Sequence, residues 1–590
     1  MFQKAPIPEL VGRQKRVEDS PTSLGSAINV GDLTALRRFL SDKPDEPLGS
    51  YGAPLHLAIY LEKEEAVDVL LEAGADPLKE PHILDLEYLT TPFGLAARLN
   101  NQALLKKIWQ HINPDINGYD IEGFDSCLVE AAQYGETATL GEILRWGQNN
   151  WSSESKSKAL SAAADNWHVE NLELLLSDKI PFEKEALTDA LAHITVSKLC
   201  FERRDQTQAE IAAQSQSIKV LMAAGADPSK PGPMMISMGE PLLIWTAMCR
   251  QLNCCLKTLL DNGANPNSTN SQGQTALHYL GARVKMDPIF RRRFEYNEPT
   301  EDVFRTLLAF NASILQQDLF GNTPLHFAAY GSPIEILHLL LSSIPIESRK
   351  IALTMPNHNG ETALHFASAG GRINTIKYLL SDNVGLNINE TASMGWTPLL
   401  RALARTVPEL QDLSLPGKIE TAQLLLAQGA NPSTIAHDGW TPLHCLAMNP
   451  NNWKREFREE ISRLVETLLL GGNSIDSRAS FAFDNPLSRR KRRHGLQEGI
   501  YCGCRESQYI ESPTEWDKVG RFDLTPLHIA AEFGALDVVV ALLRHGADPT
   551  AEDSEGNSPA RLAGNSRKYL CHSVARGTIM TTLIDAGGTY

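Results

Sequence analysis

The sequence lacks a hydrophobic run long enough to cross a membrane, because no stretch of about 18 consecutive apolar residues occurs in it. It also lacks an excess of positive charge. Its formal net charge is −16 at pH 7, which makes the whole molecule a poor generic binder of nucleic acid. The N-terminal residues contain no apolar core, so we expect a solvated leader there rather than a secretion signal.

Cysteines are few and irregularly placed. The nine cysteines form no regular framework, and an odd, uneven set fits a reducing compartment better than a disulfide-linked secreted chain. We therefore expect a cytoplasmic location, with the nucleus as an alternative. Cys502 and Cys504 follow His494, but these three ligand types stand at an unfamiliar spacing and lack a fourth partner for zinc. The sequence predicts no metal and no cofactor.

Signatures of catalysis are also absent. The sequence contains no phosphate-binding loop, dinucleotide fingerprint, kinase signature, HExxH or GxSxG. One stretch nevertheless combines the residue types of a thiol nucleophile: HDGWTPLHCLA places His444 next to Cys445, a few residues after Asp438. Whether this is an active site depends on how often the stretch recurs.

What the sequence has in quantity is repetition. Copies of a phrase close to GxTPLHxAA begin at Gly273, Gly321, Gly360, Gly395 and Gly439, among other positions. Six copies carry the histidine: His56, His278, His326, His365, His444 and His528. The cysteine occurs in one copy. Because a single reaction does not explain six histidines, we interpret His444 as a repeated structural residue and the chain as a non-enzyme.

A second phrase, close to LLxxGADP, follows many copies and ends at Pro77, Pro228, Pro266, Pro432 and Pro549. In the first phrase Thr can cap a helix and Pro fits the first helical position. The segment LDVVVALLRHG predicts a second helix with Leu536, Val539, Val540 and Leu543 on one face. The Gly of GADP then supplies a left-handed residue that ends this helix. Each unit is therefore predicted to be a helix, a turn, a helix and a hairpin, and such units must stack to bury their apolar faces.

These two phrases resemble the ankyrin repeat, and the resemblance runs from about Leu24 to Tyr590. It implies an all-α solenoid of about 14 stacked helix-turn-helix units with hairpin-like fingers and inserted loops. In this family the histidine hydrogen-bonds within and between units. The resemblance also places Cys445 on the first helix of its unit, where we expect a small buried apolar residue. The repeats between Gly123 and Lys230 depart most from the pattern.

The phrases also predict how the chain is divided. We expect a flexible leader over 1–23, divergent repeats over 24–232, central repeats over 233–448 with an insertion near 281–300, a helix with a long insertion over 449–523, and C-terminal repeats over 524–590. The longest insertion contains five consecutive basic residues, Arg489 to Arg493. They fit either a nuclear import signal or a solvated loop.

Candidate binding residues follow from the family resemblance. The residue between Gly and Thr of GxTPLH is expected to project from each finger, and the candidates are Gln274, Asn322, Glu361, Trp396 and Trp440. Exposed aromatic residues are frequent interface anchors, although the tryptophans could instead cover the neighbouring unit. Residues that follow the paired alanines are expected on the inner helix face: Gln133, Tyr134, Tyr330, Arg405, Glu532 and Phe533.

The sequence therefore predicts a protein-binding scaffold or adaptor that recognises another protein through its concave face and finger tips. A pre-formed surface of this kind lowers the ordering cost of association. We expect no generic nucleic-acid binding and no membrane insertion. Two alternatives stay open: a nuclear regulator of a transcription factor, and an unusual enzyme with a pocket in the groove that an insertion closes.

Overall fold

The computed structural model describes residues 23–40, 54–79, 90–112, 125–146, 151–177, 182–195, 207–230, 241–248, 253–282, 300–381, 384–404, 415–448, 458–481, 521–565 and 573–590. The chain forms two compact units. The first comprises residues 1–242 and 254–264, and the second comprises residues 243–253 and 265–590. The basic run Arg489–Arg493, with His494, Cys502 and Cys504, lies outside the described residues, as does Arg405.

Along the described chain the helices follow one another as fourteen pairs, as the repeat phrases predict. The pairs of the first unit are α1 (Leu24–Val30) and α2 (Leu33–Phe39), α3 (Pro54–Tyr60) and α4 (Glu64–Glu72), α5 (Pro92–Arg98) and α6 (Gln102–Ile112), α7 (Asp125–Tyr134) and α8 (Thr137–Trp146), α9 (Ser153–Asp165) and α10 (Val169–Ser177), and α11 (Lys184–Thr195) and α12 (Gln208–Ala224). The next pair is α14 (Leu242–Met248), most of which belongs to the second unit, and α15 (Asn253–Asp261), most of which belongs to the first.

The remaining pairs belong to the second unit. They are α16 (Ala276–Ala282) and α18 (Glu301–Ala309), α19 (Pro324–Gly331) and α20 (Ile334–Ser342), α22 (Ala363–Ala369) and α23 (Ile373–Leu380), α24 (Pro398–Leu403) and α25 (Leu415–Ala427), α26 (Pro442–Ala447) and α27 (Arg458–Leu470), α29 (Pro526–Phe533) and α30 (Leu536–Arg544), and α31 (Pro559–Asn565) and α32 (Ser573–Asp585). Two further elements interrupt the series: α21 (Ile346–Thr354) and the short 3-10 helix η4 (Ser393–Gly395).

The predicted start and stop signals determine these helices. Thr525 caps α29 by accepting a hydrogen bond from the backbone N–H of His528, and Pro526 occupies the first helical position. At the end of α30, Gly546 adopts a φ of 87°, the left-handed conformation that a GADP glycine was predicted to supply. The glycines at positions 74, 225, 263 and 429 do the same.

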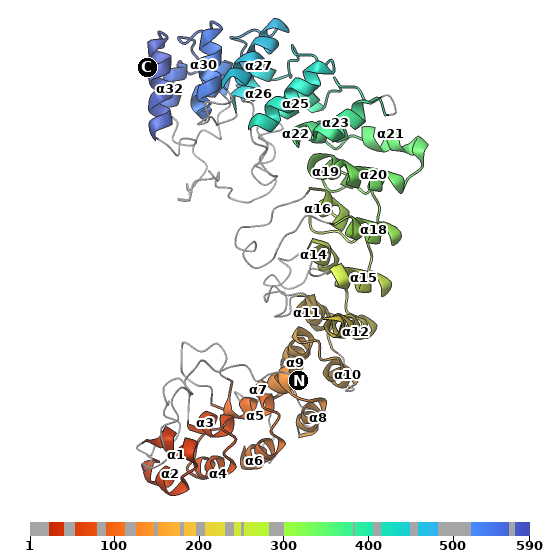
Figure 1. Cartoon of the computed structure of the whole chain (residues 1–590), viewed down its shortest axis with the longest axis vertical. Helices are drawn as coiled ribbons and strands as arrows, with labels where there is room; N and C mark the ends of the chain where they lie inside the picture. The colour runs from red at the N-terminus through yellow and green to blue at the C-terminus, as the bar shows by residue number, and fades with distance from the viewer. Residues whose placement is uncertain are drawn as a thin grey trace. The chain divides into compact units, whose positions relative to one another are not determined.

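In the second unit the first helices of the pairs form one row and the second helices form another (Figure 1). Within the first row α16 packs on α19, and α19 packs on α22. The approach is close because these helices carry small residues: a Cβ atom placed on Gly370 would lie 2.1 Å from the carbonyl oxygen of Tyr330. The paired alanines Ala328 and Ala329 are fully buried in this row.

Hairpin-like fingers connect the pairs, and one of them contains the longest insertion. In that finger β1 (Ala479–Phe481) pairs antiparallel with β2 (Arg521–Leu524), and Ala479 lies opposite Leu524. Residues 482–520 therefore join the two strands of a finger rather than two helices. The two strands form the single sheet among the described residues, and the all-α prediction is confirmed there. None of the described helices is long and apolar enough to cross a membrane.

Candidate protein-binding surface

Five of the repeat histidines make the same two hydrogen bonds, one within their own unit and one to the next unit. His326 illustrates the pattern: the backbone N–H of Thr323 donates to Nδ1 over 3.0 Å, so Nε2 carries the proton and donates to the carbonyl oxygen of Glu361 over 3.1 Å. The same bonds recur at His278, His365, His444 and His528, whose Nε2 atoms reach the carbonyl oxygens of Asn322, Trp396, Leu524 and Asn557. The predicted structural role of these histidines is confirmed.

This geometry decides the question raised by His444 and Cys445. Both nitrogens of His444 are engaged, Nδ1 with the backbone N–H of Thr441 and Nε2 with the carbonyl oxygen of Leu524. Burial lowers the pKa of His444 to about 4. Cys445 is fully buried, and burial, together with the nearby Asp438 carboxylate, raises the pKa of its thiol well above its usual range. The imidazole of His444 is neutral, and hydrogen bonds occupy both of its nitrogens, so it cannot take a proton from the Cys445 thiol. The thiol therefore stays protonated and is not activated as a nucleophile.

The fingers are joined to one another by backbone hydrogen bonds. The N–H of Leu319 donates to the carbonyl oxygen of Gln272 over 2.9 Å, and the N–H of His358 donates to Phe320 over 2.9 Å. The series continues from Ser393 to Asn359, from His437 to Met394 and from Ser480 to Asp438. The tips of these fingers therefore form one connected row within the second unit.

The candidate residues between Gly and Thr are mostly buried, and their side chains contact residues of the adjacent fingers. The side-chain amide of Asn322 donates to Asp318 Oδ2 over 3.1 Å, and Gln274 donates to the same oxygen over 3.4 Å. Asn357 Nδ2 then donates to Asn322 Oδ1 over 2.9 Å, so polar side chains from three successive fingers are linked. Asn322 is buried and Gln274 is half-buried.

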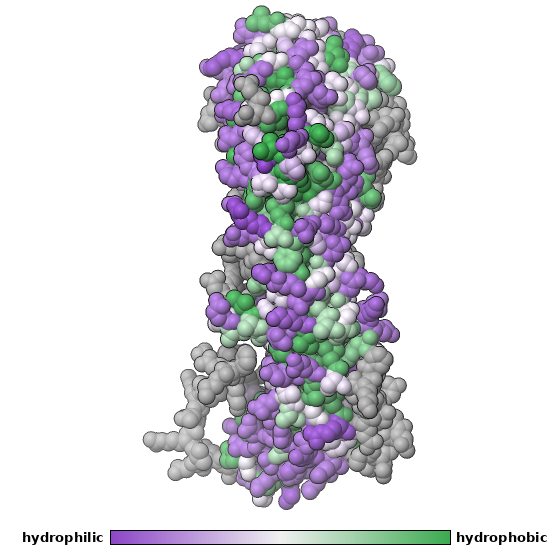
Figure 2. All heavy atoms as spheres, turned by 90° about the vertical axis from the view of Figure 1, so that its right-hand side faces the viewer, coloured by the Kyte–Doolittle hydropathy of each residue, from purple (hydrophilic) through white to green (hydrophobic). Residues whose placement is uncertain are grey.

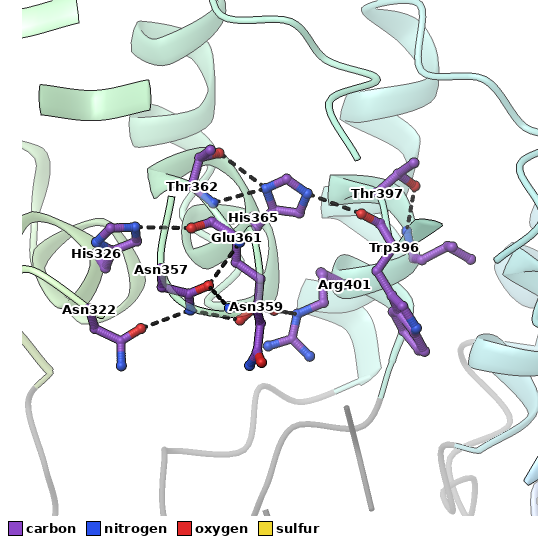
Figure 3. A network of polar contacts seen from close by, with 11 residues as sticks. Asn322, His326, Asn357, Asn359, Glu361, Thr362, His365, Trp396, Thr397 and Arg401 are labelled. Carbon is purple, nitrogen blue, oxygen red and sulfur yellow. Dashed lines mark hydrogen bonds and ion pairs between the residues drawn. The ribbon is translucent and has the colours of Figure 1, made fainter. Parts of the chain in front are cut away.

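The same chain of contacts continues to Arg401 (Figure 3). Asn357 Nδ2 lies 3.1 Å from Glu361 Oε2, and the Nε atom of Arg401 lies 2.7 Å from Glu361 Oε1 in an ion pair that is largely buried. Sequence reasoning missed Arg401. A signal was present, because Arg401 stands where the phrase has Tyr279, Phe327, Phe366 and Cys445 in other copies, and a charge in an apolar column needs a partner.

Trp396 and Trp440 occupy the position between Gly and Thr in the next two fingers. Their ring centroids lie 6.3 Å apart with an interplanar angle of 31°, and the side chains are 1% and 0% exposed. The indole N–H of Trp440 donates to the carbonyl oxygen of Ser480 over 3.0 Å. Trp396 and Trp440 therefore do not project from their fingers. They cover the adjacent fingers, which is the alternative that the sequence left open for them.

The inner-helix candidates differ in their access to solvent. Tyr330 and Phe533 are buried, whereas Glu532 is half-buried. In the first unit Tyr134 remains exposed, and the guanidinium of Arg98 lies over its ring at 5.0 Å. The backbone carbonyl oxygen of the neighbouring Gln133 accepts a hydrogen bond from the side-chain amide of Asn166 over 3.2 Å. The structure brings these candidates to inner-helix ends, but it leaves few of them open.

Two other positions in four successive fingers are open to solvent, and we call these residues the finger edge. In each of these fingers the two exposed residues flank a buried one, as Gln317 and Leu319 flank the buried Asp318. The finger edge comprises Gln317, Leu319, Pro356, His358, Thr391, Ser393, Ile435 and His437, all of which are exposed. Sequence reasoning missed this set, because triplets such as Gln317-Asp318-Leu319 and Pro356-Asn357-His358 show no alternation of apolar and polar residues.

Among the described residues no group of three or more His, Cys, Asp or Glu side chains is arranged to hold a metal ion. Four segments of the chain match models of the ankyrin repeat. Residues 53–80 match the single ankyrin repeat, residues 350–412 match ankyrin repeats in three copies, and residues 298–341 and 518–563 match ankyrin repeats in many copies.

Two similar curated proteins are NF-kappa-B inhibitor zeta of Mus musculus and of Homo sapiens. Each is 25% identical to this chain over 265 residues, which make up 42% of the chain. The matched part spans about a third of each relative, 35% and 36% of their lengths. With the repeated helix pairs, the bridging histidines and the stacked fingers, the matches lead to one conclusion: the chain is an ankyrin-repeat protein.

Proposed function

We propose that the chain is a protein-binding scaffold and that its second unit recognises a partner protein through the finger edge. The observation that carries the proposal is the alternation of buried and exposed side chains within the fingers. Every second side chain stacks on the neighbouring fingers, and the intervening side chains are left open along a row that backbone hydrogen bonds hold together.

The chemistry of the finger edge favours a protein partner. Leu319 and Ile435 are 63% and 64% exposed, which leaves branched aliphatic side chains in water where burial by a partner would be favourable. The other edge residues are uncharged hydrogen-bonding groups, imidazoles and a proline, in a chain whose net charge is −16. Partner recognition on this surface requires little ordering of the backbone, since the fingers are already joined.

Within this proposal the candidates Gln274, Asn322, Glu361, Trp396 and Trp440 support the surface from below and do not themselves contact the partner. Glu532 lies partly open near the C-terminal end of α29, where it would extend the contact toward the inner helices. Arg405 lies outside the described residues, and no contact is proposed for it.

Affinity purification followed by mass spectrometry tests the proposal with matched baits. The wild-type chain, the double variant L319S/I435S and the control variant L470S are compared; Leu470 ends α27 and is 84% exposed. We expect a set of proteins that the wild type and L470S retain and that L319S/I435S loses, while all three melt at the same temperature. Retention of every partner by L319S/I435S would exclude the finger edge as the binding surface.

A second candidate function is regulation of a transcription factor in the nucleus, because the two relatives are named NF-kappa-B inhibitors. For this chain we propose a DNA-binding transcription factor as the partner class and Arg489–Arg493 as the import signal. Fluorescent fusions of the wild type and of a variant with serines at 489–493 test the second part. Equal nuclear fractions would remove the import role, and absence of any transcription factor among the finger-edge partners would remove the partner class.

A further inference from the structure

The helix α21 departs from the repeat. In several pairs a GADP or GANP turn follows the second helix directly, as the turn that contains Gly546 follows α30. After α20 the chain instead passes through Ile344 and Pro345 and forms α21 (Ile346–Thr354) before the next finger begins near Asn357. In the second unit α21 lies beyond α20 and α23, on the side formed by the second helices (Figure 1).

This helix is fixed on one side and open on the other. Ala352 and Leu353 are buried and hold α21 against the array, whereas Ile346 and Ile351 are 73% and 68% exposed. The ammonium of Lys350, between the two isoleucines in sequence, reaches the carbonyl oxygen of Gly385 over 3.4 Å. Two large aliphatic side chains are thus held in water on a helix that does not need them for its own packing.

Half-buried apolar residues also lie on the second helices of this unit. Figure 2 faces this side of the second unit and shows hydrophobic residues gathered at the level of α20, α21 and α23. Leu339 on α20 and Tyr378 on α23 are half-buried, and the ring of Tyr378 meets His338 edge-on with centroids 4.5 Å apart. Contiguous exposed apolar patches on soluble proteins commonly mark interaction sites.

The charges on this surface select among partners. On α21 the charged side chains are Glu347, Arg349 and Lys350, and Lys377 projects from the neighbouring α23. With the exposed Glu335 of α20 included, three cations stand against two acids here, although the whole chain carries a net charge of −16. A segment that combines apolar with acidic side chains complements both features.

We propose that α21, through Ile346, Lys350 and Ile351, docks an acidic amphipathic helix of a partner protein. The two isoleucines lie five residues apart on the helix, about 7.5 Å along its axis and about 140° around it, so they border an exposed face on which Lys350 lies between them. Apolar side chains three or four residues apart on a partner helix lie about 4.5–6 Å apart along its axis and can pack on the exposed face between the two isoleucines, which would place neighbouring carboxylates near Lys350. This surface lies on the second-helix side and is independent of the finger edge.

Fluorescence anisotropy with the full chain tests the proposal. The probe is a labelled 16-residue helical peptide with leucines at three- and four-residue spacing and Asp or Glu elsewhere; a peptide with Lys in place of every acid is its control. We expect saturable binding of the acidic peptide, at least tenfold weaker binding by I346S/I351S and by K350E, and unchanged binding by L470S and by L319S/I435S. The last variant separates this surface from the finger edge.

Thermal melts and far-ultraviolet circular dichroism check that the α21 variants remain folded, which is expected because Ala352 and Leu353 are untouched. Three results would overturn the proposal: no saturable binding of the acidic peptide, equal binding of the lysine peptide, or equal loss of binding in L470S. Sedimentation velocity supplies a fourth. If the wild type dimerises and I346S/I351S does not, the occupant is a second copy of the chain and not an acidic helix.

Discussion

His444 and Leu524 are 80 residues apart in the sequence, yet Nε2 of His444 lies 3.1 Å from the carbonyl oxygen of Leu524. The equivalent bond from His326 to Glu361 spans 35 residues. Since the two bonds have the same length and the same partners in the repeat, the insertion over 482–520 interrupts a finger hairpin without interrupting the stack of units. The units on either side of residues 482–520 therefore stack in the same way as units without an insertion.

The first prediction follows from this placement. Replacing residues 482–520 with Asn-Gly should leave the array folded, because Phe481 and Arg521 are already antiparallel partners and Asn-Gly suits a two-residue hairpin turn. Thermal unfolding followed by circular dichroism should give a midpoint equal to or slightly above that of the wild type. A deletion extended through Leu524 is the control, and it should unfold the last units. A lower midpoint in the first variant would show that the insertion belongs to the core.

The second prediction concerns acid. Burial lowers the pKa of His365 and of His444 to about 4, whereas an unfolded chain has a histidine pKa of about 6.5. The unfolded state therefore binds more protons, so the stability these residues contribute is complete above pH 6.5 and is lost as the pH falls toward 4. The loss amounts to about 3 kcal/mol for each of the two.

Urea denaturation at a series of pH values from 7.5 to 4.5 measures this loss. The variant His365→Gln should be less stable at pH 7.5, because it loses the bond to the carbonyl oxygen of Trp396, but its midpoint should depend less on pH. His278, His326 and His528 also have a pKa lowered by burial and should add to the wild-type slope. Parallel pH profiles for the wild type and His365→Gln would contradict the argument.

The helices could be predicted from the sequence because their signals are local. Thr525 and Pro526 start α29 and Gly546 ends α30 through their own backbone preferences, whatever the neighbouring units are. The buried face of α30 was predicted less well. Val539 is buried as expected, but Leu536 and Val540 are half-buried, and Val538 and Leu542 are buried in their place. A short helix with apolar residues on most sides does not itself specify its core face.

The site was harder to predict because it depends on neighbouring units. Whether Trp396 projects or is covered is decided by Trp440 in the next finger, and the ion pair of Glu361 depends on Arg401 one unit away. Helix α21 had no signal in either repeat phrase, because it occupies the place where the second phrase is missing. Local sequence preferences thus predict the helices of each unit. Which side chains stay exposed and available to a partner is decided by the stacking of neighbouring units.

The third prediction tests the polar contacts between fingers. Glu361→Gln should lower the free energy of unfolding by about 3 kcal/mol, since it leaves the guanidinium of Arg401 largely buried without its carboxylate. Chemical denaturation measures the change, and Glu347→Gln on the exposed face of α21 is the matched control, with an expected effect within about 0.5 kcal/mol. The double variant E361Q/R401M should be more stable than E361Q alone. Additive losses in the double variant would mean that the two residues are not coupled.

The fourth prediction compares the stacked tryptophans. Trp440 donates its indole N–H to the carbonyl oxygen of Ser480, whereas the buried Nε1 of Trp396 has no hydrogen-bond partner among the described residues. Trp396→Phe and Trp440→Phe remove the same volume, so their difference isolates the hydrogen bond. W440F should be the less stable of the two by about 1 kcal/mol, because it leaves the Ser480 carbonyl without this donor.

The same pair of variants tests whether the tryptophans only cover the adjacent fingers or also contact the partner protein. Both side chains are buried, so a partner that binds the finger edge should bind W396F and W440F with wild-type affinity wherever the variants are folded. Thermal melts and binding isotherms for each variant make the comparison, with L319S/I435S as the variant expected to lose binding while it remains folded. If W396F or W440F loses affinity at full folding, the partner contacts the tryptophans directly, and the fingers must open to admit it.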